Sequence, residues 1–162
     1  MEDMTFSQFI SDYNTLYKEG NRLYHSLAKH FGLSDTAFWI LYSLEESETA
    51  LTQTELCSTL CLSKQTINSA LKTLANAGYI TLEAPHSKHR SKYISLTLPG
   101  RELTKHTIDP IFRLEEQAYE GLSDEERRTL LSLNRRYLDL LCQAAKPVLE
   151  KTDQEEPFSN AD

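Results

Sequence analysis

Apolar residues recur every three or four positions along most of the chain, which is the spacing of amphipathic helices. The first run covers residues 5–31, and a second follows Ser34, whose hydroxyl suits a helix N-cap. A third run begins at Thr52, where Glu55 completes a capping box, and a fourth begins after Ser63. The pattern therefore predicts four helices in the first half of the chain.

The fourth helix, residues 64–77, has two contrasting faces. Its apolar face consists of Ile67, Ala70, Leu71 and Leu74, which we expect to be buried. Its polar face consists of Ser63, Lys64, Gln65, Thr66, Asn68, Ser69 and Lys72. Gly78 follows the last turn and suits the left-handed conformation that ends many helices.

Beyond this glycine the period changes from helical to alternating. Residues 79–83 and 92–98 alternate apolar with polar and predict two antiparallel strands, and residues 50–52 form a short extended piece. The connection between the two strands is long and positively charged. Two short helices joined by a tight turn, then a hairpin with a charged loop, are typical of a winged helix-turn-helix, which we assign to residues 33–98.

Helices flank this module on both sides. Residues 1–32 hold one helix and residues 99–146 hold more, with a break expected at Pro110 and a capping box at Ser123. The tail, residues 147–162, lacks periodicity and is expected to be flexible. The flanking helices carry more apolar surface than one small domain covers, so we expect a homodimer. The predicted fold is mainly α with a small β wing, and N- and C-terminal dimerisation helices surround the module.

Charge is distributed unevenly along the chain. The total formal charge is −7, yet residues 63–101 hold six Lys or Arg and one acid, Glu83, which leaves −12 for the remainder. The basic residues are Lys64, Lys72, Lys88, Arg90, Lys92 and Arg101. Binding to duplex DNA requires positive charge where closely spaced phosphates approach. The basic residues lie where a winged helix would meet a duplex.

The polar face of the fourth helix carries side chains that can read bases. Glutamine and asparagine pair bidentately with adenine, serine and threonine reach either base type, and lysine meets guanine or phosphate. We therefore predict that this face enters the major groove of double-stranded DNA. A solvated face without a ligand is the alternative, and the basic connection that follows favours DNA.

The segments LTQTELCSTLCLSKQTINSALKTLANAGYI and ISLTLPG, with helices in this order around them, resemble the MarR (multiple-antibiotic-resistance regulator) family of bacterial winged-helix transcription factors. The resemblance covers roughly residues 6–145. It implies a homodimeric regulator, most often a repressor, that binds a palindromic operator and releases it when a small molecule or oxidant is sensed. No cofactor is implied.

The resemblance also assigns the wing. Its predicted DNA contacts are His86, Lys88, His89, Arg90 and Lys92. The family's Asp-x-Arg pair falls at Lys88 and Arg90, so the arginine is retained and the acid that would orient it is replaced. The wing is therefore more positive than in the family and lacks that orienting partner.

Family ligands bind in a crevice between the dimer helices and the DNA-binding module. Tyr13, Tyr17, Trp39 and Tyr42 are candidates to line such a pocket for a small-molecule effector. The same aromatic residues also suit a plain core or interface role.

Two sensor chemistries compete with this interpretation. Cys57 and Cys61 are four residues apart in the third helix, which suggests a thiol or metal sensor. A disulfide at that spacing requires distortion, and cysteine is among the most buried residue types, so a core role is favoured. Cys142 falls near the end of the last helix, in the expected dimer region. His25, His30 and His106 lack the i, i+4 spacing of a helical metal site, so hydrogen-bonded or solvated histidines are favoured.

Other function classes find little support in the sequence. Neither a phosphate-cradling glycine motif nor Gly-x-Ser-x-Gly is present, so we do not expect an enzyme. No run approaches the roughly 20 apolar residues of a membrane span. The acidic start and the three cysteines, which form no disulfide framework, indicate a cytoplasmic protein. A winged helix that binds a protein instead of DNA remains the second hypothesis.

Overall fold

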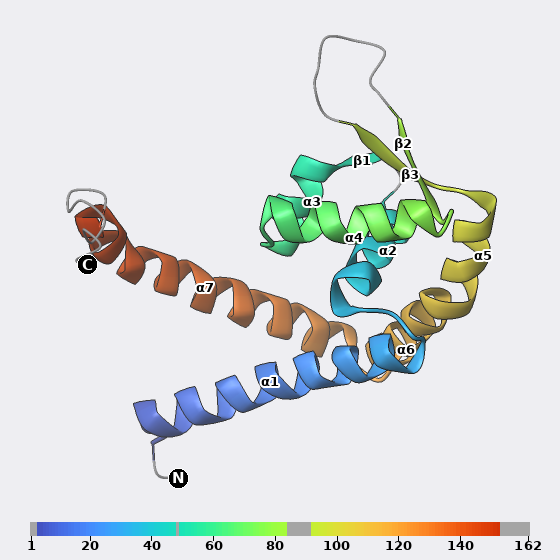
Figure 1. Cartoon of the computed structure of the whole chain (residues 1–162). Coiled ribbons are helices and arrows are strands. Elements are labelled where there is room, and N and C mark those ends of the chain that lie inside the picture. Colours follow the sequence, from blue (N-terminus) through green and yellow to red (C-terminus); the bar gives the residue numbers. More distant parts are fainter. Residues whose placement is uncertain (1–2, 48, 84–91, 153–162) are drawn as a thin grey trace. The chain divides into compact units, whose positions relative to one another are not determined.

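The computed structural model describes residues 3–47, 49–83 and 92–152, with side chains up to residue 150. The chain divides into two compact units, residues 1–113 and 114–162. The first unit holds α1 (Phe6–His30), α2 (Asp35–Glu46), β1 (Leu51–Thr52), α3 (Gln53–Leu60), α4 (Lys64–Asn76), β2 (Ile80–Glu83), β3 (Tyr93–Leu96) and α5 (Leu98–Thr107) (Figure 1). Helix α6 (Asp109–Glu120) spans the boundary, and α7 (Asp124–Thr152) lies in the second unit. The predicted fold class, mainly α with a small β wing, is confirmed.

The helices begin at the capping residues that the sequence predicts. Ser34 caps α2 and Ser63 caps α4, each accepting a hydrogen bond from a backbone N–H in the first turn. Thr52 and Glu55 form the predicted capping box at the start of α3. Gly78 follows α4 with φ of 78°, as its left-handed role requires. Local hydrogen bonding therefore sets the boundaries of the helix-turn-helix.

The strands form an antiparallel sheet in the order β1-β3-β2. The predicted hairpin pairs Ile80 with Leu96, and the short extended piece becomes a third strand that pairs Leu51 with Ile94. The prediction that the second hairpin strand runs to residue 98 is wrong. Thr97 caps α5 instead, because its hydroxyl oxygen accepts a hydrogen bond from the backbone N–H of Gly100.

The core of the first unit lies between the helix-turn-helix and the sheet. Its largest fully buried side chains include Phe38, Ile40 and Leu41 of α2, Leu56 of α3, Ile67 of α4, Ile94 of β3 and Ile108. Of the four residues predicted to face inward on α4, Ala70 alone is only partly buried. Burial of one apolar face therefore fixes which face of α4 points outward.

A compact junction joins the end of α4 to the start of α5. The Thr97 hydroxyl donates to the Gly78 carbonyl oxygen at 2.6 Å, and the Thr97 N–H donates to the Tyr79 carbonyl oxygen at 3.0 Å. Gly100 packs against the same carbonyl, where a Cβ would overlap the Tyr79 oxygen. The Leu-Thr-x-x-Gly stretch therefore holds the hairpin to the end of α4. Its glycine is required because the Tyr79 carbonyl leaves no room for a Cβ.

Among the C-terminal helices, the predicted break near Pro110 is found, but the last helix ends later than predicted. The helix breaks at Ile108, between α5 and α6, with Pro110 in the first turn of α6, as predicted. The expectation of a loose tail from Pro147 is wrong for its first residues, because α7 continues to Thr152. Proline deprives the Gln143 carbonyl of its helical donor, but Gln143 is exposed and water can replace that donor.

None of the helices in the described ranges is long and apolar enough to span a membrane.

Candidate nucleic-acid interface

The outward face of α4 includes every residue that the sequence predicts there. Ile67, Leu71 and Leu74 are buried in the core, with 0–4% of their surface exposed. All seven residues predicted to contact DNA from this helix and its cap are exposed. The helix therefore presents a continuous polar surface one face wide, which is what a major groove admits.

The polar side chains of α4 differ in how far they are already engaged. The Ser63 and Thr66 hydroxyls lie 2.8 Å apart, and Ser63 also accepts from the Thr66 N–H at 3.1 Å, so this pair mainly organises the helix start. Gln65, Asn68 and Lys72 have no intramolecular side-chain partner within the described residues. Their amide and ammonium groups are available to an external ligand.

The positive charge at the start of α4 is unfavourable for the stability of this helix. Helices α2, α3, α6 and α7 carry acids in their first turns, which complement the positive end of the helix dipole. Helix α4 has no acid there and begins with Lys64. A cation at a helix N-terminus is unfavourable by a few tenths of a kcal/mol to about 1 kcal/mol unless an anion offsets it. An external phosphate would supply that anion.

Helix α3 packs against α4 and helps to fix its position. The Gln53 amide donates to the Lys64 carbonyl oxygen at 3.3 Å and so links the starts of the two helices. The Thr52 backbone N–H and hydroxyl donate to a Glu55 carboxylate oxygen at 2.7 and 2.8 Å. These two hydrogen bonds lower the pKa of Glu55 below its ordinary value of 4.5. The capping box is therefore strongest with Glu55 ionised.

The structure adds one feature that sequence reasoning missed, the start of α2 beside α4. A groove of about 420 Å³ lies between them, with Ser34 and Thr36 on one side and Gln65, Ser69 and Thr73 on the other. The cap at Ser34 was readable from the sequence, but its proximity to the polar face of α4 depends on tertiary packing. The N-terminus of α2 adds positive dipole potential to this surface.

Of the predicted wing contacts, Lys92 is described, and it is exposed immediately before β3. His86, Lys88, His89 and Arg90 lie outside the described residues. Strands β2 and β3 lead into and out of that connection, and the Thr97 junction attaches their base to the end of α4. The contacts assigned to the wing remain predictions from the sequence.

Of the two cysteines expected in the core, Cys61 departs from that role. Cys57 is partly buried against the core, but Cys61 is exposed and caps α3 in a left-handed conformation with φ of 51°. Because Cys61 leaves the regular helix, the i, i+4 argument no longer places both sulfur atoms on one face. Cys142 is also an exposed free thiol.

His25 fits the hydrogen-bonded role and His106 the solvated role that the sequence favours. His25 Nδ1 lies 2.9 Å from the Asp35 carboxylate, and His106 Nε2 lies 4.0 Å from the Glu102 carboxylate. No group of three His, Cys, Asp or Glu gathers into a metal site within the described part of the chain.

The four aromatic candidates for an effector pocket have different surroundings. Trp39 and Tyr42 lie together, with ring centroids 5.3 Å apart, in a cluster of aromatic side chains packed against the core. Tyr13 stacks on Phe9 at 5.8 Å, and Tyr17 is 67% exposed. Trp39 and Tyr42 thus have a packing role, and the structure leaves an effector role for the four untested.

Comparisons with known proteins agree with this geometry. Residues 31–91 match the model of the MarR family. The fold resembles NMB1585, a MarR family regulator from Neisseria meningitidis, with a TM-score of 0.70, 20% identity and coverage of 88% of this chain and 97% of that one. Staphylococcus aureus MepR in complex with DNA has a TM-score of 0.65 and 20% identity, with coverage of 86% of this chain and 99% of that one. S. aureus MarR in complex with salicylate and kanamycin has a TM-score of 0.65 and 19% identity, with coverage of 85% of this chain and 92% of that one. No curated protein sequence matches the chain.

Proposed function

We propose that the chain, whose residues 31–91 match the MarR family model, is a dimeric transcriptional regulator of the MarR type that binds specific DNA sequences through α4. The observation that carries the proposal is the outward face of this helix. Gln65 and Asn68 are exposed and have no side-chain partner among the residues that the structure describes, and the opposite face of their helix is buried in the core. Amide side chains that project from a helix fixed in this way suit bidentate recognition of adenine in the major groove.

Charge supports the same surface. Lys64 and Lys72 lie at the start and in the middle of α4 and pair with no acid within the described residues. The wing contacts proposed from the sequence, His86, Lys88, His89, Arg90 and Lys92, add positive charge beside them. When the closely spaced phosphates of DNA bind to this basic surface, they would release their counterions and so favour binding. This local effect does not require the chain as a whole to be basic. The similarity of the fold to DNA-bound MepR supports this use of the module.

Dimerisation is proposed from apolar surface that each of the two units, taken by itself, leaves exposed. On α1, Phe6, Leu16, Tyr17 and Leu23 are 58–80% exposed. On α7, taken by itself, Leu130, Leu131, Leu133, Leu138, Leu140 and Leu141 are 47–71% exposed. Helices that remain monomeric rarely expose apolar rows of this kind. A twofold dimer would present two copies of α4, so a palindromic operator is proposed.

The regulatory outcome that we propose is repression relieved by a small molecule. A dimer bound over a promoter excludes polymerase, and a relative with this fold binds salicylate and kanamycin. Tyr13, Tyr17, Trp39 and Tyr42 remain the candidates for the crevice between the dimer helices and the DNA-binding module.

Selection of duplexes from a random library, followed by sequencing, tests the proposed function. Rounds of binding to the purified full-length chain should enrich an inverted repeat, and Gln65→Ala or Asn68→Ala should change the preferred base at particular positions. A matched variant at the C-terminal end of the same helix, Asn76→Ala, should enrich the same repeat as the wild type. If the wild-type chain enriches no sequence, specific recognition of DNA is wrong.

A further inference from the structure

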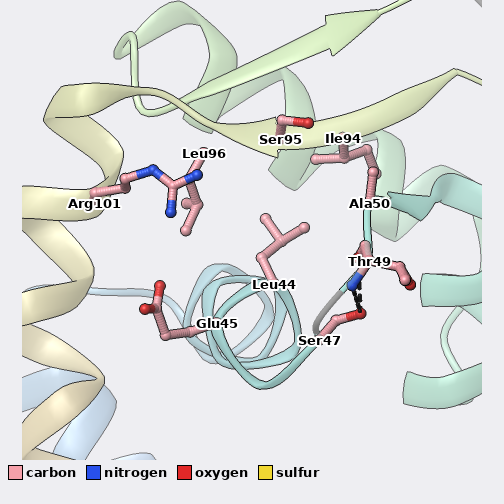
Figure 2. A pocket seen from close by; sticks show the side chains of 9 residues that line it. All are labelled: Leu44, Glu45, Ser47, Thr49, Ala50, Ile94, Ser95, Leu96 and Arg101. Carbon is pink, nitrogen blue, oxygen red and sulfur yellow. Dashed lines mark hydrogen bonds between the residues drawn. The ribbon is translucent and has the colours of Figure 1, made fainter.

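A pocket in the first unit lies apart from the outward face of α4 and from the four aromatic candidates. It has a volume of about 240 Å³ and lies between the end of α2, the residues that lead into β1, strand β3 and the start of α5 (Figure 2). Its lining is mostly polar, with apolar side chains such as Leu44 and Leu96 forming the smaller part, and Glu45 and Arg101 give it one charge of each sign. Nothing in the proposed function uses this pocket.

The two charged side chains enter the pocket from different helices. Glu45 comes from α2 and Arg101 from α5, and Figure 2 shows both pointing inward. They do not form an ion pair in the described part of the chain, and the Arg101 guanidinium has no partner there. A cation and an anion that share a pocket without pairing are each available to a bound molecule.

The carboxylate is also held in position. Thr104 is only 1% exposed, its hydroxyl lies 3.0 Å from Glu45 Oε2 and 3.1 Å from the Arg101 carbonyl oxygen, and its one proton can be donated to the charged carboxylate. This bond uses one of the several acceptor positions of the carboxylate, so the rest remain open. A fixed carboxylate with free acceptor positions is suited to an ammonium group.

The edge of the sheet adds backbone groups to the pocket. The β1–β3 ladder ends at the pair Leu51 and Ile94, because the Ser47 hydroxyl donates to the Thr49 carbonyl at 2.8 Å and accepts from the Thr49 N–H at 3.3 Å. The Thr97 N–H bonds to Tyr79 on the β2 side. Since strand residues alternate, the N–H and C=O of Leu96 face the β1 side, where the ladder has stopped. One backbone donor and one acceptor are therefore directed to this end of the pocket.

We propose that this pocket binds a small free amino acid. The guanidinium of Arg101 would take the carboxylate in a charge-assisted bidentate pair, and Glu45 would accept from the ammonium group. The backbone of Leu96 would supplement both contacts, and the apolar part of the lining would take an aliphatic side chain. The volume lies below the roughly 300–1,000 Å³ of pockets for drug-sized ligands, which restricts the occupant to a small molecule.

An occupant would connect three elements that meet the DNA-binding surface. Helix α2 begins beside α4, β3 leads directly from the wing connection, and α5 starts at the Thr97 junction. Filling the pocket would restrain these elements relative to one another and so change the affinity for DNA. That regulatory consequence rests on the proposed function, whereas the binding of the amino acid does not.

Isothermal titration calorimetry on the full-length protein without DNA tests the proposal. The probes are glycine, L-alanine, L-valine and 4-aminobutyrate. Isovalerate and isobutylamine, which are valine without its ammonium group and valine without its carboxylate, are the matched controls. At least one zwitterion should bind, and its singly charged analogues should bind at least about tenfold more weakly, because each analogue lacks one charge-assisted contact.

Variants test which side chains are responsible. Arg101→Gln and Glu45→Gln should each weaken binding by about tenfold or more. The amide oxygen that Glu45→Gln introduces can still accept from the Thr104 hydroxyl, so this variant removes the charge and keeps the internal hydrogen bond. Lys105→Gln and Glu46→Gln, which change exposed neighbours outside the pocket on the same helices, should bind like the wild type. Because the analogues are titrated into the wild-type chain, their result does not depend on the folding of any variant.

Three outcomes would overturn the proposal. The first is that no zwitterion gives a heat of binding at any concentration tested. The second is that the singly charged analogues bind as tightly as the zwitterion. The third is that Arg101→Gln and Glu45→Gln both bind the zwitterion as tightly as the wild type. A failure of the DNA selection would leave these titrations unaffected, so the two proposals fail separately.

Discussion

Replacement of Gly100 by alanine tests the junction that holds the hairpin to the recognition helix. Gly100 lies in the first turn of α5, where alanine would ordinarily stabilise a helix by about 1 kcal/mol relative to glycine. In this chain the added Cβ would overlap the Tyr79 carbonyl oxygen and lie 2.9 Å from the Tyr79 carbonyl carbon. Both atoms belong to the backbone, so no side-chain rotation relieves the overlap.

The size of the effect follows from the bonds that a shift would break. Moving the start of α5 disrupts the cap between Thr97 Oγ1 and the Gly100 N–H, a type of contact that contributes about 1 kcal/mol. It also weakens the bonds from Thr97 to Gly78 and Tyr79, at roughly 1 kcal/mol each. Overpacking costs a further 1–3 kcal/mol or so. Allowing for the gain in helix propensity, we expect Gly100→Ala to lower the free energy of unfolding by about 3–5 kcal/mol.

Urea denaturation followed by circular dichroism measures this change. The matched control is Gly20→Ala in the middle of α1, where a Cβ would meet nothing within 4 Å and the variant should be unchanged or slightly more stable. The two alanine variants are therefore expected to change stability by very different amounts and, where Gly20→Ala has any effect, in opposite directions. If Gly100→Ala unfolds within about 0.5 kcal/mol of the wild type, the steric argument for the Leu-Thr-x-x-Gly stretch is refuted.

Three further predictions concern assembly, base recognition and pH. Light scattering at micromolar concentration should give twice the chain mass of 18.6 kDa, and a stable, folded monomer would contradict the shared-core argument. By fluorescence anisotropy, Gln65→Ala and Asn68→Ala should each cost about 1–3 kcal/mol on the cognate duplex, and a uniform loss on cognate and random duplexes would count against base contacts. The lowered pKa of Glu55 stabilises the folded chain above the ordinary pKa of 4.5, and this stabilisation is lost as the pH falls through the pKa of the folded state. The difference in free energy of unfolding between the wild type and Glu55→Gln should therefore shrink from about pH 6 to about pH 3. A difference that stays constant over this range would mean that the ionised capping box contributes nothing.

The sequence predicted best those features that depend on neighbours along the chain. The caps at Ser34, Thr52 and Ser63 and the stop at Gly78 all involve hydrogen bonds or backbone conformations within a few residues, so the residue types alone indicate them. The outward face of α4 was predicted for the same reason, because helical periodicity decides which residues share a face. The break before Pro110 is also local.

Features that depend on tertiary contacts were missed or misplaced. Residues 92–98 alternate like a strand to the end, but Thr97 bonds to Gly78 and Tyr79 and starts a helix instead. Cys61 was assigned to the core, yet it adopts a left-handed conformation that leaves it exposed. The pocket that holds Glu45 and Arg101 joins residues 56 positions apart and has no signature in the sequence.

The central claim is that α4 and the basic residues near it bind duplex DNA, and the salt dependence of affinity tests it most directly. Anisotropy with a labelled duplex should show log K falling steeply as log[salt] rises, because each phosphate contact releases counterions. Lys72→Gln should weaken binding to all sequences and reduce the slope by roughly one unit per subunit, whereas Lys146→Gln on α7 should leave the slope unchanged. An affinity that does not depend on salt, or a Lys72→Gln slope equal to that of the wild type, would contradict the assignment of this surface to DNA.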